Sequence, residues 1–419
     1  MHTGTDAGLG YDPAGFDHNS AEYARSWRDI YKDLRQQCPV ARSEAYGGFY
    51  VLTRYSDVAR AVKDDETFSS FHDQAPESPY GGIIIPPVPS VSTPIEMDPP
   101  DFTPLRKLLN PFFAPGKATT WEPFTRDVAT AMIDLVIETG RIDFVEDLTS
   151  PVPAIFTGAL LGIPLQDWRM YADVAHAVVY TPPASPEFAG VYQKMGELLM
   201  RVAAAAEERR SDPRDDLLTA LVQFRYPDGQ GLTSQVIMEI CTLIIAGGDD
   251  TTTGLVANSL LWLSDHPDKR DWLRADLTRL RPACEEFLRY FTPTQGLART
   301  VRKPVEIAGH KLVPGDRVWL SFASANLDPE EFDRPDEIIL DRFPNRHQAF
   351  GLGLHRCLGS NFTRMEFRVM LEEVLTRMPD FTVDAGASER YENIGIVNGW
   401  KTMPATFTPG RRRGSTFQP

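Results

Sequence analysis

Apolar residues recur at helical spacing along most of this chain. The clearest stripe follows the cysteine at position 357 and consists of Leu358, Phe362, Met365, Val369 and Met370. Steps of three and four residues place such side chains on one face of a helix. Helical patterns also cover 57–62, the chain after Pro104 and most of 121–210, so helices are expected to dominate the fold.

The longest helical pattern begins at Thr233 or Ser234, either of which can cap a helix, and ends near Pro267. A helix of about 32 residues rises ~48 Å at ~1.5 Å per residue. An element of that length is expected to cross the whole domain and to be largely buried.

Strand patterns are few and short. We expect strands at 49–52, 305–307 and 317–320, the last two beside turns at Gly309 and 314–316. No repeat or convincing linker divides the chain. The sequence therefore predicts one domain over residues 1–419, mainly α with a small mixed β part.

Residues 72–95 interrupt this regular pattern. The segment is rich in proline and glycine, which predicts a long irregular loop, and it also carries Ile83, Ile84 and Val88. These apolar side chains either cover an edge of the core or face an apolar ligand. We treat the loop as a candidate substrate lid.

Charge and cysteine content narrow the possible partners. The net charge of −15 argues against nucleic acid or an anionic membrane as a partner. No run approaches the ~18 apolar residues of a membrane helix, and the N-terminus is polar and acidic. The four cysteines are scattered, without a zinc-type pair or a disulfide pattern. A cytoplasmic protein is expected.

One cysteine lies in a glycine-rich loop directly ahead of a helix. Phe350, Gly351, Gly353, His355, Cys357 and Gly359 form the pattern F-G-x-G-x-H-x-C-x-G. Glycines allow a close approach to the backbone, and a helix N-terminus favours a thiolate. Two other interpretations are a structural buried cysteine and a dinucleotide loop. The second fails because Arg356 stands where the third glycine belongs.

The long helix also contains a segment that weakens it, Ala246-Gly247-Gly248-Asp249-Asp250-Thr251-Thr252-Thr253. Each glycine costs roughly 0.5–1 kcal/mol relative to alanine in a helix. A rule broken inside a strong element is typical of a functional site. On these residues alone, a kink with solvated aspartates is about equally plausible.

The cysteine loop resembles the haem-thiolate signature of the cytochromes P450, and 247–252 is similar to the oxygen-binding motif of that family. The resemblance extends over nearly the whole chain. It implies the cytochrome P450 fold, with the long helix over haem b and Cys357 as the axial ligand. Phe350, Gly351 and Gly359 would shape the cofactor site. Thr251 would hold dioxygen or water, and Asp250 would relay protons from solvent.

The resemblance also assigns structural and propionate-binding roles. Glu286 and Arg289 match the E-x-x-R motif, which is implied to be buried, to pair with Arg334 and to brace the cysteine loop. Three residues would pair with the haem propionates: Arg299, His355 and Arg106. Phe102 stands where the family usually has a histidine, which removes one expected contact.

Four segments are implied to converge as an apolar pocket above the haem. They contribute Ile83, Ile84, Val88, Leu243, Ala246, Gly247, Thr294, Leu297, Ile396 and Val397. Their largely apolar character supports this assignment independently and predicts a small to medium apolar substrate.

The predicted function is a monooxygenase that inserts one atom of O2 into that substrate. The residues after Cys357 are too few for an electron-transfer domain, so we expect a separate ferredoxin and its reductase as electron donors. Rival haem-thiolate functions are a peroxide-dependent peroxygenase and a non-oxygenating enzyme. A haem-binding sensor or carrier is a third alternative. The Asp250–Thr251 pair argues against the peroxygenase and the non-oxygenating enzyme, because it serves proton delivery to bound dioxygen. The costly helix break argues against the sensor or carrier.

Overall fold

The computed structural model describes residues 10–418 except 76 and 182–185, and it is mainly helical, as predicted. Residues 1–9 lie outside the described residues. They include part of the polar, acidic N-terminus from which we expected no membrane anchor. The α-helices of the described residues are α1 Ala21–Gln37, α2 Tyr55–Lys63, α3 Phe102–Leu109, α4 Pro115–Val136, α5 Pro151–Leu161, α6 Trp168–Tyr180, α7 Phe188–Ser211, α8 Leu217–Gln223, α9 Ser234–Gly248, α10 Asp250–Asp265, α11 Pro267–Ala275, α12 Leu280–Phe291, α13 Phe322–Ala325 and α14 Ser360–Arg377.

The strands are short, and those expected at 49–52, 305–307 and 317–320 are confirmed as β2, β6 and β8. The full set is β1 Val40–Ser43, β2 Phe49–Leu52, β3 Phe68–Ser69, β4 Arg141–Asp143, β5 Leu297–Val301, β6 Val305–Ile307, β7 His310–Leu312, β8 Arg317–Leu320, β9 Thr382–Val383, β10 Glu389–Arg390, β11 Trp400–Thr402 and β12 Pro404–Thr406.

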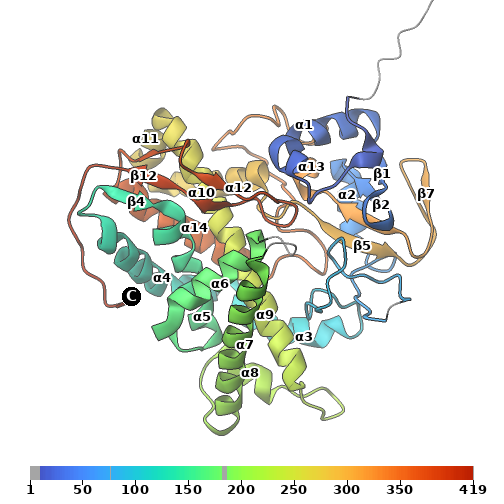
Figure 1. The fold of residues 1–419 in the computed structure, drawn as a ribbon, viewed down its shortest axis with the longest axis horizontal. Coiled ribbons are helices and arrows are strands. Elements are labelled where there is room, and N and C mark those ends of the chain that lie inside the picture. The colour runs from blue at the N-terminus through green and yellow to red at the C-terminus, as the bar shows by residue number, and fades with distance from the viewer. Residues whose placement is uncertain (1–9, 76, 182–185, 419) are drawn as a thin grey trace, which may run out of the picture.

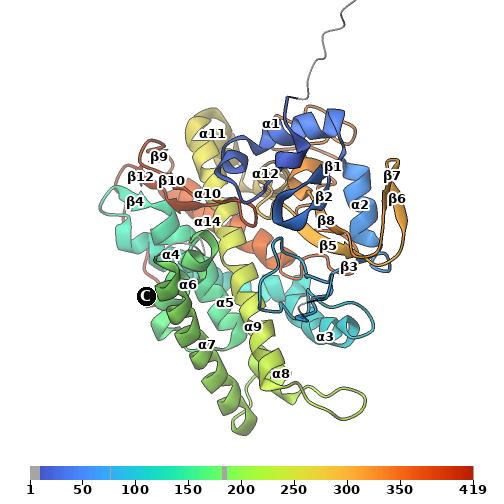
Figure 2. The same cartoon turned by 45° about the vertical axis from the view of Figure 1, so that its right-hand side comes forward.

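The largest sheet has the order β1-β2-β8-β5-β3. Its β2–β8 pair is parallel, with Val51 opposite Trp319, and the other pairs are antiparallel. A second sheet has the order β4-β12-β9, and two ribbons are formed by β6-β7 and β10-β11. In Figures 1 and 2, β1 and β2 lie with α1 and α2 on one side, and α4–α7 lie on the other.

The helix over 234–265 runs between these two sides (Figure 1). Its cap and its end are as predicted: the Thr233 side chain accepts from the N–H of Val236, and α10 ends at Asp265. The element is nevertheless two helices, because α9 and α10 are separated at Asp249. This break falls within the Gly247–Asp250 segment that weakens the helix, and it positions the candidate proton-delivery residues.

The helix that follows the cysteine loop packs its apolar stripe into the main core. Phe362, Met365, Val369 and Met370 on α14 are all buried, and Leu358 lies just ahead of the helix. The neighbours of α14 include α4, α10 and α12. This burial fixes the helix N-terminus, and the cysteine loop that precedes it, against the centre of the molecule.

The described residues of the 72–95 segment contain no helix or strand, as expected for an irregular loop. The loop is nonetheless tied down by Glu96, whose carboxylate accepts from the N–H groups of Ile83 and Ser92 and contacts His72 Nδ1 at 3.0 Å. Arg317 of β8 donates to the carbonyls of Gly81, Gly82 and Ile84. These contacts fix the position of Ile83 and Ile84 next to β5.

No helix among the described residues is long and apolar enough to cross a lipid bilayer.

Candidate haem-thiolate site

The cysteine loop is a tight turn closed by backbone hydrogen bonds. The N–H of Cys357 donates to the carbonyl of Phe350 at 2.8 Å, and that of Gly351 donates to Gln348 at 2.8 Å. Gly351 and Gly353 adopt positive φ values of 62° and 66°, which side chains rarely tolerate. The loop glycines are therefore required by backbone geometry, and the turn presents Cys357 just before α14 begins at Ser360.

The electrostatic surroundings of Cys357 act in two directions. Burial raises the pKa of the thiol, while the N–H of Gly359 and the charges of Arg106, Arg356 and Arg364 act to lower it. Burial has the larger effect in the protein alone. A thiolate at this position therefore needs a further cation in direct contact, which haem iron would supply.

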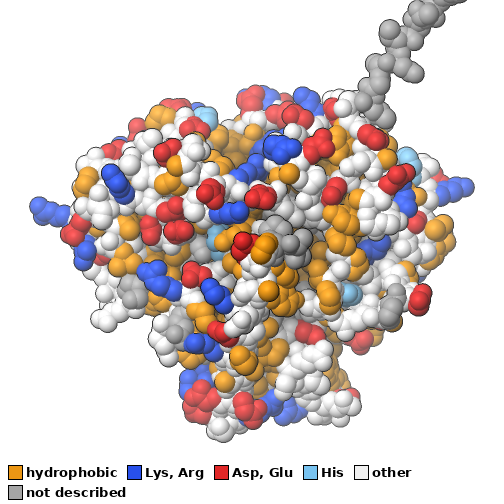
Figure 3. All heavy atoms as spheres, viewed as in Figure 1, with side chains coloured by type: hydrophobic (Ala, Val, Ile, Leu, Met, Phe, Trp, Pro, Cys, Tyr) orange, Lys and Arg blue, Asp and Glu red, His pale blue; other side chains and the backbone are white. Residues whose placement is uncertain are grey.

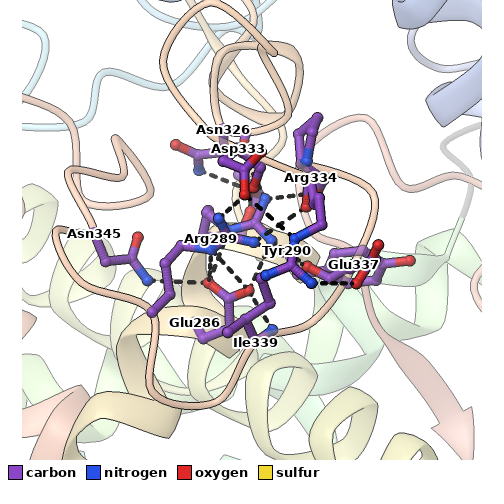
Figure 4. Close-up of polar contacts among 12 residues, drawn as sticks. Glu286, Arg289, Tyr290, Asn326, Asp333, Arg334, Glu337, Ile339 and Asn345 are labelled. Carbon is purple, nitrogen blue, oxygen red and sulfur yellow. Dashed lines mark hydrogen bonds and ion pairs between the residues drawn. The ribbon is translucent and has the colours of Figure 1, made fainter.

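The E-x-x-R pair is fully buried on α12, as expected. Arg289 donates to both oxygens of Glu286 at 2.8 Å. The Glu286 carboxylate also accepts from Arg342 Nε at 3.0 Å, from Asn345 Nδ2 at 3.1 Å and from the N–H of Ile339 at 2.8 Å. Figure 4 shows Arg289, Ile339 and Asn345 around Glu286, the last two from the chain that follows α13.

The predicted pairing of the motif with Arg334 is wrong, because Arg342 takes that place. The Arg334 side chain is 56% exposed and pairs with Asp333 and Glu337. Its backbone has a φ of 46°, and its carbonyl accepts from Arg342 Nη2 at 3.1 Å. The chain therefore turns at Arg334, its side chain lies at the surface, and only its backbone supports the network.

The buried network continues to the cysteine loop, which supports the bracing role of the motif. Arg289 Nη1 donates to the carbonyl of Asn326, and the Asn326 side chain accepts from the N–H of Gln348 at 2.6 Å. The Gln348 carbonyl in turn accepts from Gly351. Glu286 and Arg289 are thus linked to the loop through two residues, without contacting Cys357 themselves.

Three cationic or titratable residues expected at the propionates lie near one another. Burial, together with the charges of Arg299 and Arg106, lowers the pKa of His355 to about 3. Both ring nitrogens of His355 are buried and have no hydrogen-bond partner. Arg299 is also buried, which lowers its pKa to about 10. The buried charge of Arg299 favours an anionic partner, and an unpartnered imidazole N–H needs a hydrogen-bond acceptor; the two carboxylates of haem would meet both needs.

Two further features bear on that fit. Phe102 packs its ring against His355 with a centroid distance of 4.5 Å, so it contributes packing where a histidine would donate. Arg106 Nη2 already donates to the carbonyl of Arg356 at 2.7 Å, which ties α3 to the cysteine loop.

Two glycines border open space. A Cβ built on Gly247 or Gly359 would meet no neighbouring group within 4 Å, and this space suits a flat macrocycle.

The helix break places two side chains in contrasting environments. The Thr251 hydroxyl donates to the carbonyl of Gly247 at 2.9 Å, the back-bond expected to bend the helix. Its oxygen lone pairs remain available to accept a further hydrogen bond. Asp250 is 1% exposed and lies at the first position of α10. A proton can reach this carboxylate only through the groups packed against it.

Sequence reasoning missed those groups. The Tyr391 hydroxyl donates to both Asp250 oxygens at 2.8 Å, and His176 Nδ1 lies 2.7 Å from Oδ1. Tyr391 follows β10, and His176 is on α6. Neither residue belongs to a motif, and each is more than seventy residues from Asp250, so no local signal in the sequence pointed to them.

Two buried carboxyl groups beside the break were also missed. Burial, together with the charge of Asp250 and against a hydrogen bond with Thr157, raises the pKa of Asp249 to about 8. Burial likewise raises the pKa of Glu366 on α14 well above its ordinary value, although a hydrogen bond with Thr252 opposes the shift. The raised pKa of Asp249 favours its neutral form near pH 7.

The expected pocket residues come from segments that backbone hydrogen bonds join. The N–H of Ala298 donates to Ile83 at 2.7 Å, Thr294 pairs with Val397 in an isolated bridge, and the N–H of Gln295 donates to Ile396. Ile83 and Val397 are themselves buried. The other expected lining residues keep exposed surface: Ile84, Val88, Leu243, Ala246, Gly247, Thr294, Leu297 and Ile396. Their contact with a substrate stays a prediction.

Comparison with known proteins agrees with this geometry. The family model for cytochrome P450 matches residues 156–390. A steroid C26-monooxygenase of Mycolicibacterium smegmatis is 32% identical over 91% of this chain and 93% of its own. A vitamin D(3) 25-hydroxylase of Pseudonocardia autotrophica is 30% identical over 90% and 93%. The crystal structure of CYP109E1 from Bacillus megaterium in complex with testosterone has a TM-score of 0.81 at 28% identity, covering 93% of this chain and all of that one.

Proposed function

Because the chain belongs to the cytochrome P450 family of haem-thiolate monooxygenases, we propose that it inserts one oxygen atom of O2 into an apolar, steroid- or terpenoid-sized substrate. The observation that carries this proposal is the coexistence of two features in one chain. Cys357 lies in the glycine loop, and the helix break holds the Thr251 hydroxyl on Gly247 with Asp250 beside it.

The cofactor proposed is haem b. Cys357 would ligate the iron, and Arg299, His355 and Arg106 would hold the propionates. Bound haem would supply electron transfer and oxygen activation, which a thiolate ligand favours. Burial of the Arg299 charge and the unpartnered nitrogens of His355 support the assignment, since the first favours an anion and the second needs a hydrogen-bond acceptor. Phe350, Gly351 and Gly359 would let the macrocycle lie close to the backbone.

The residues of the chain itself would control proton delivery and water. Thr251 already uses its own proton on Gly247, so its oxygen is free to accept a hydrogen bond from reacting oxygen or from water. Asp250 would supply protons to that position. The apolar lining residues would exclude bulk water, which limits proton delivery to this route.

The proposed substrate class is supported by the apolar character of the expected lining residues and by the substrates named for similar proteins. Apart from Thr294, the expected lining residues carry no polar side-chain atom, so a charged or sugar-like molecule would lose hydration without compensation. Relatives include enzymes named for steroids and for vitamin D(3), and a similar structure is a complex with testosterone. Loop 72–95 would act as the substrate lid through Ile84 and Val88.

Separate redox proteins are the proposed electron source, namely a ferredoxin and its reductase. Arg346, Arg356 and Lys107 are exposed near the cysteine loop, whereas Arg364 is paired with Glu285 at 2.6 Å. The face drawn in Figure 3 instead intersperses acidic and basic side chains. An acidic ferredoxin would be steered by the positive charges of Arg346, Arg356 and Lys107. The scattered cysteines support a cytoplasmic location.

Replacement of Thr251 by alanine is the sharpest test of the proposed chemistry. We expect folding, haem content and the reduced carbon monoxide spectrum to stay as in wild type. We also expect a several-fold rise in hydrogen peroxide released per NAD(P)H consumed, because doubly reduced oxygen escapes when its protons are misdirected. Asp250→Asn should slow turnover, by up to the ~10²–10⁴-fold that general acid–base catalysis contributes. Tightly coupled turnover at full rate in both variants would contradict the proposal.

A spin-state titration tests the substrate class. Steroids, terpenoids and fatty or aromatic molecules should shift the haem from low spin to high spin, because an apolar ligand displaces water from the pocket. Ile84→Glu should weaken that binding by about tenfold or more, since a buried apolar contact becomes a desolvated charge. Shifts produced only by highly charged or sugar-like compounds would refute this class.

A further inference from the structure

Asp250 is held by two partners on separate elements, and only one of them reaches solvent in the described part of the chain. The His176 side chain on α6 is 12% exposed, against 1% for Asp250, and the two groups meet at 2.7 Å. Tyr391 is 2% exposed. Because Asp250 is sealed from water on its own, the route of its protons depends on these two residues.

Tyr391 is suited to positioning Asp250 and not to supplying protons. Burial raises the pKa of Tyr391 well above its ordinary value, and the charge of Asp250 adds to the effect. The phenol therefore stays protonated and donates to both carboxylate oxygens. It fixes the rotamer of Asp250 and leaves Oδ1 in contact with the imidazole.

Burial and the Asp250 carboxylate act in opposite directions on the pKa of His176. Burial alone would lower the pKa of His176, but the hydrogen bond and charge of Asp250 outweigh it and raise the pKa above its ordinary value. The remaining groups around His176 favour the same direction. Its Nε2 faces the carbonyl of Lys401 of β11 at 3.4 Å, and Glu146 of the short helical turn Val145–Thr149 adds negative charge.

The neighbouring Tyr180 ring borders further charged groups. Tyr180 packs against both His176 and Tyr391, and the negative charges of Asp173 on α6 and Glu389 on β10 act on its hydroxyl. The Lys401 ammonium lies over the Tyr180 ring at 5.3 Å and is the positive group of this cluster. The carboxylates that act on His176 itself, Asp250 and Glu146, stabilise its charged form.

We propose that His176 is the proton entry of the Asp250 relay. Its partly exposed imidazole takes a proton from solvent and passes the Nδ1 proton to Oδ1 of Asp250. Asp250 becomes a neutral carboxylic acid, and the imidazole is reprotonated from water before the next turnover. This inference rests on the proposed function, because it supplies protons to the same Asp250–Thr251 pair.

The substitution His176→Gln tests the relay, since glutamine keeps a donor for Asp250 but does not titrate. In wild type, turnover should fall as pH rises through the pKa of His176, because the protonated form is the donor. The variant should lose this alkaline limb, show a larger solvent isotope effect and turn over more slowly, toward the lower end of the ~10²–10⁴-fold range of general acid–base catalysis. Substrate affinity, measured by spin-state titration, should not change.

Tyr180→Phe is the matched control, because it keeps the ring packing against His176 and should retain the wild-type pH profile. A readout independent of turnover is the imidazole titration of His176 by NMR in the diamagnetic ferrous carbon monoxide form. Its pKa should be raised in wild type and should fall toward the ordinary value in Asp250→Asn. If His176→Gln fails to fold, His176→Asn replaces it.

The outcomes separate this inference from the proposed function. An impaired Asp250→Asn with an unimpaired His176→Gln would overturn the role of His176 and leave the Asp250–Thr251 pair standing. Unimpaired turnover in both variants would overturn the relay as a whole. An ordinary pKa of His176 that does not respond to Asp250→Asn would likewise overturn the entry role.

Discussion

Replacing Cys357 by serine is expected to abolish the red-shifted band that the reduced carbon monoxide complex of a thiolate-ligated haem displays. Monooxygenase turnover should be lost completely with it. A serine hydroxyl is a far weaker acid than a thiol, so the loop would present a neutral oxygen ligand that donates little electron density. The measurement is a difference spectrum of the reduced protein with and without carbon monoxide.

The matched control is Cys38→Ser, which also removes a thiol that is only partly buried. Cys38 contacts the carbonyl of Val40 at 3.6 Å, at the start of β1 and far in sequence from the glycine loop. This variant should keep the band and the turnover of wild type. A Cys357→Ser protein that kept the red-shifted band would show that the axial ligand is another residue.

Features set by residues close together in the sequence could be predicted, and the cysteine loop is the best example. The turn requires positive φ values at Gly351 and Gly353, so these glycines, within ten residues of Cys357, indicate the turn in the sequence itself. The helix break was visible for the same reason, because Gly247 and Gly248 weaken α9 locally. The sequence did not show that Gly248 lies against Thr157 of α5, which a Cβ on Gly248 would crowd.

Contacts between distant segments could not be predicted in this way. Arg334 and Arg342 both follow the E-x-x-R helix within a short, irregular stretch, and spacing does not say which side chain turns inward. The left-handed backbone at Arg334 decides it in favour of Arg342. His176 and Tyr391 reach Asp250 from α6 and from the end of β10, so their role follows only from tertiary packing.

Because Arg342, and not Arg334, pairs with Glu286, we expect replacement of Arg342 to have a large effect on stability. Arg342→Ala should destabilise the protein by a few kcal/mol, toward the ~3–5 kcal/mol that breaking a buried ion pair costs. Glu286 is fully buried and would keep Arg289 but lose the Arg342 Nε that contacts both of its oxygens. Because whole proteins are stable by only ~5–15 kcal/mol, much of the variant should fail to fold or to retain haem.

Arg334→Ala is the control, because alanine keeps the carbonyl that accepts from Arg342 while removing an exposed side chain. Its surface pairs with Asp333 and Glu337 should contribute only ~0–1 kcal/mol. Urea unfolding followed by circular dichroism, with haem content measured on the same samples, compares the two variants. Equal losses, or a larger loss in Arg334→Ala, would show that Arg334 is the partner of Glu286. A loss confined to Arg342→Ala would assign bracing of the cysteine loop to the buried triad of Glu286, Arg289 and Arg342.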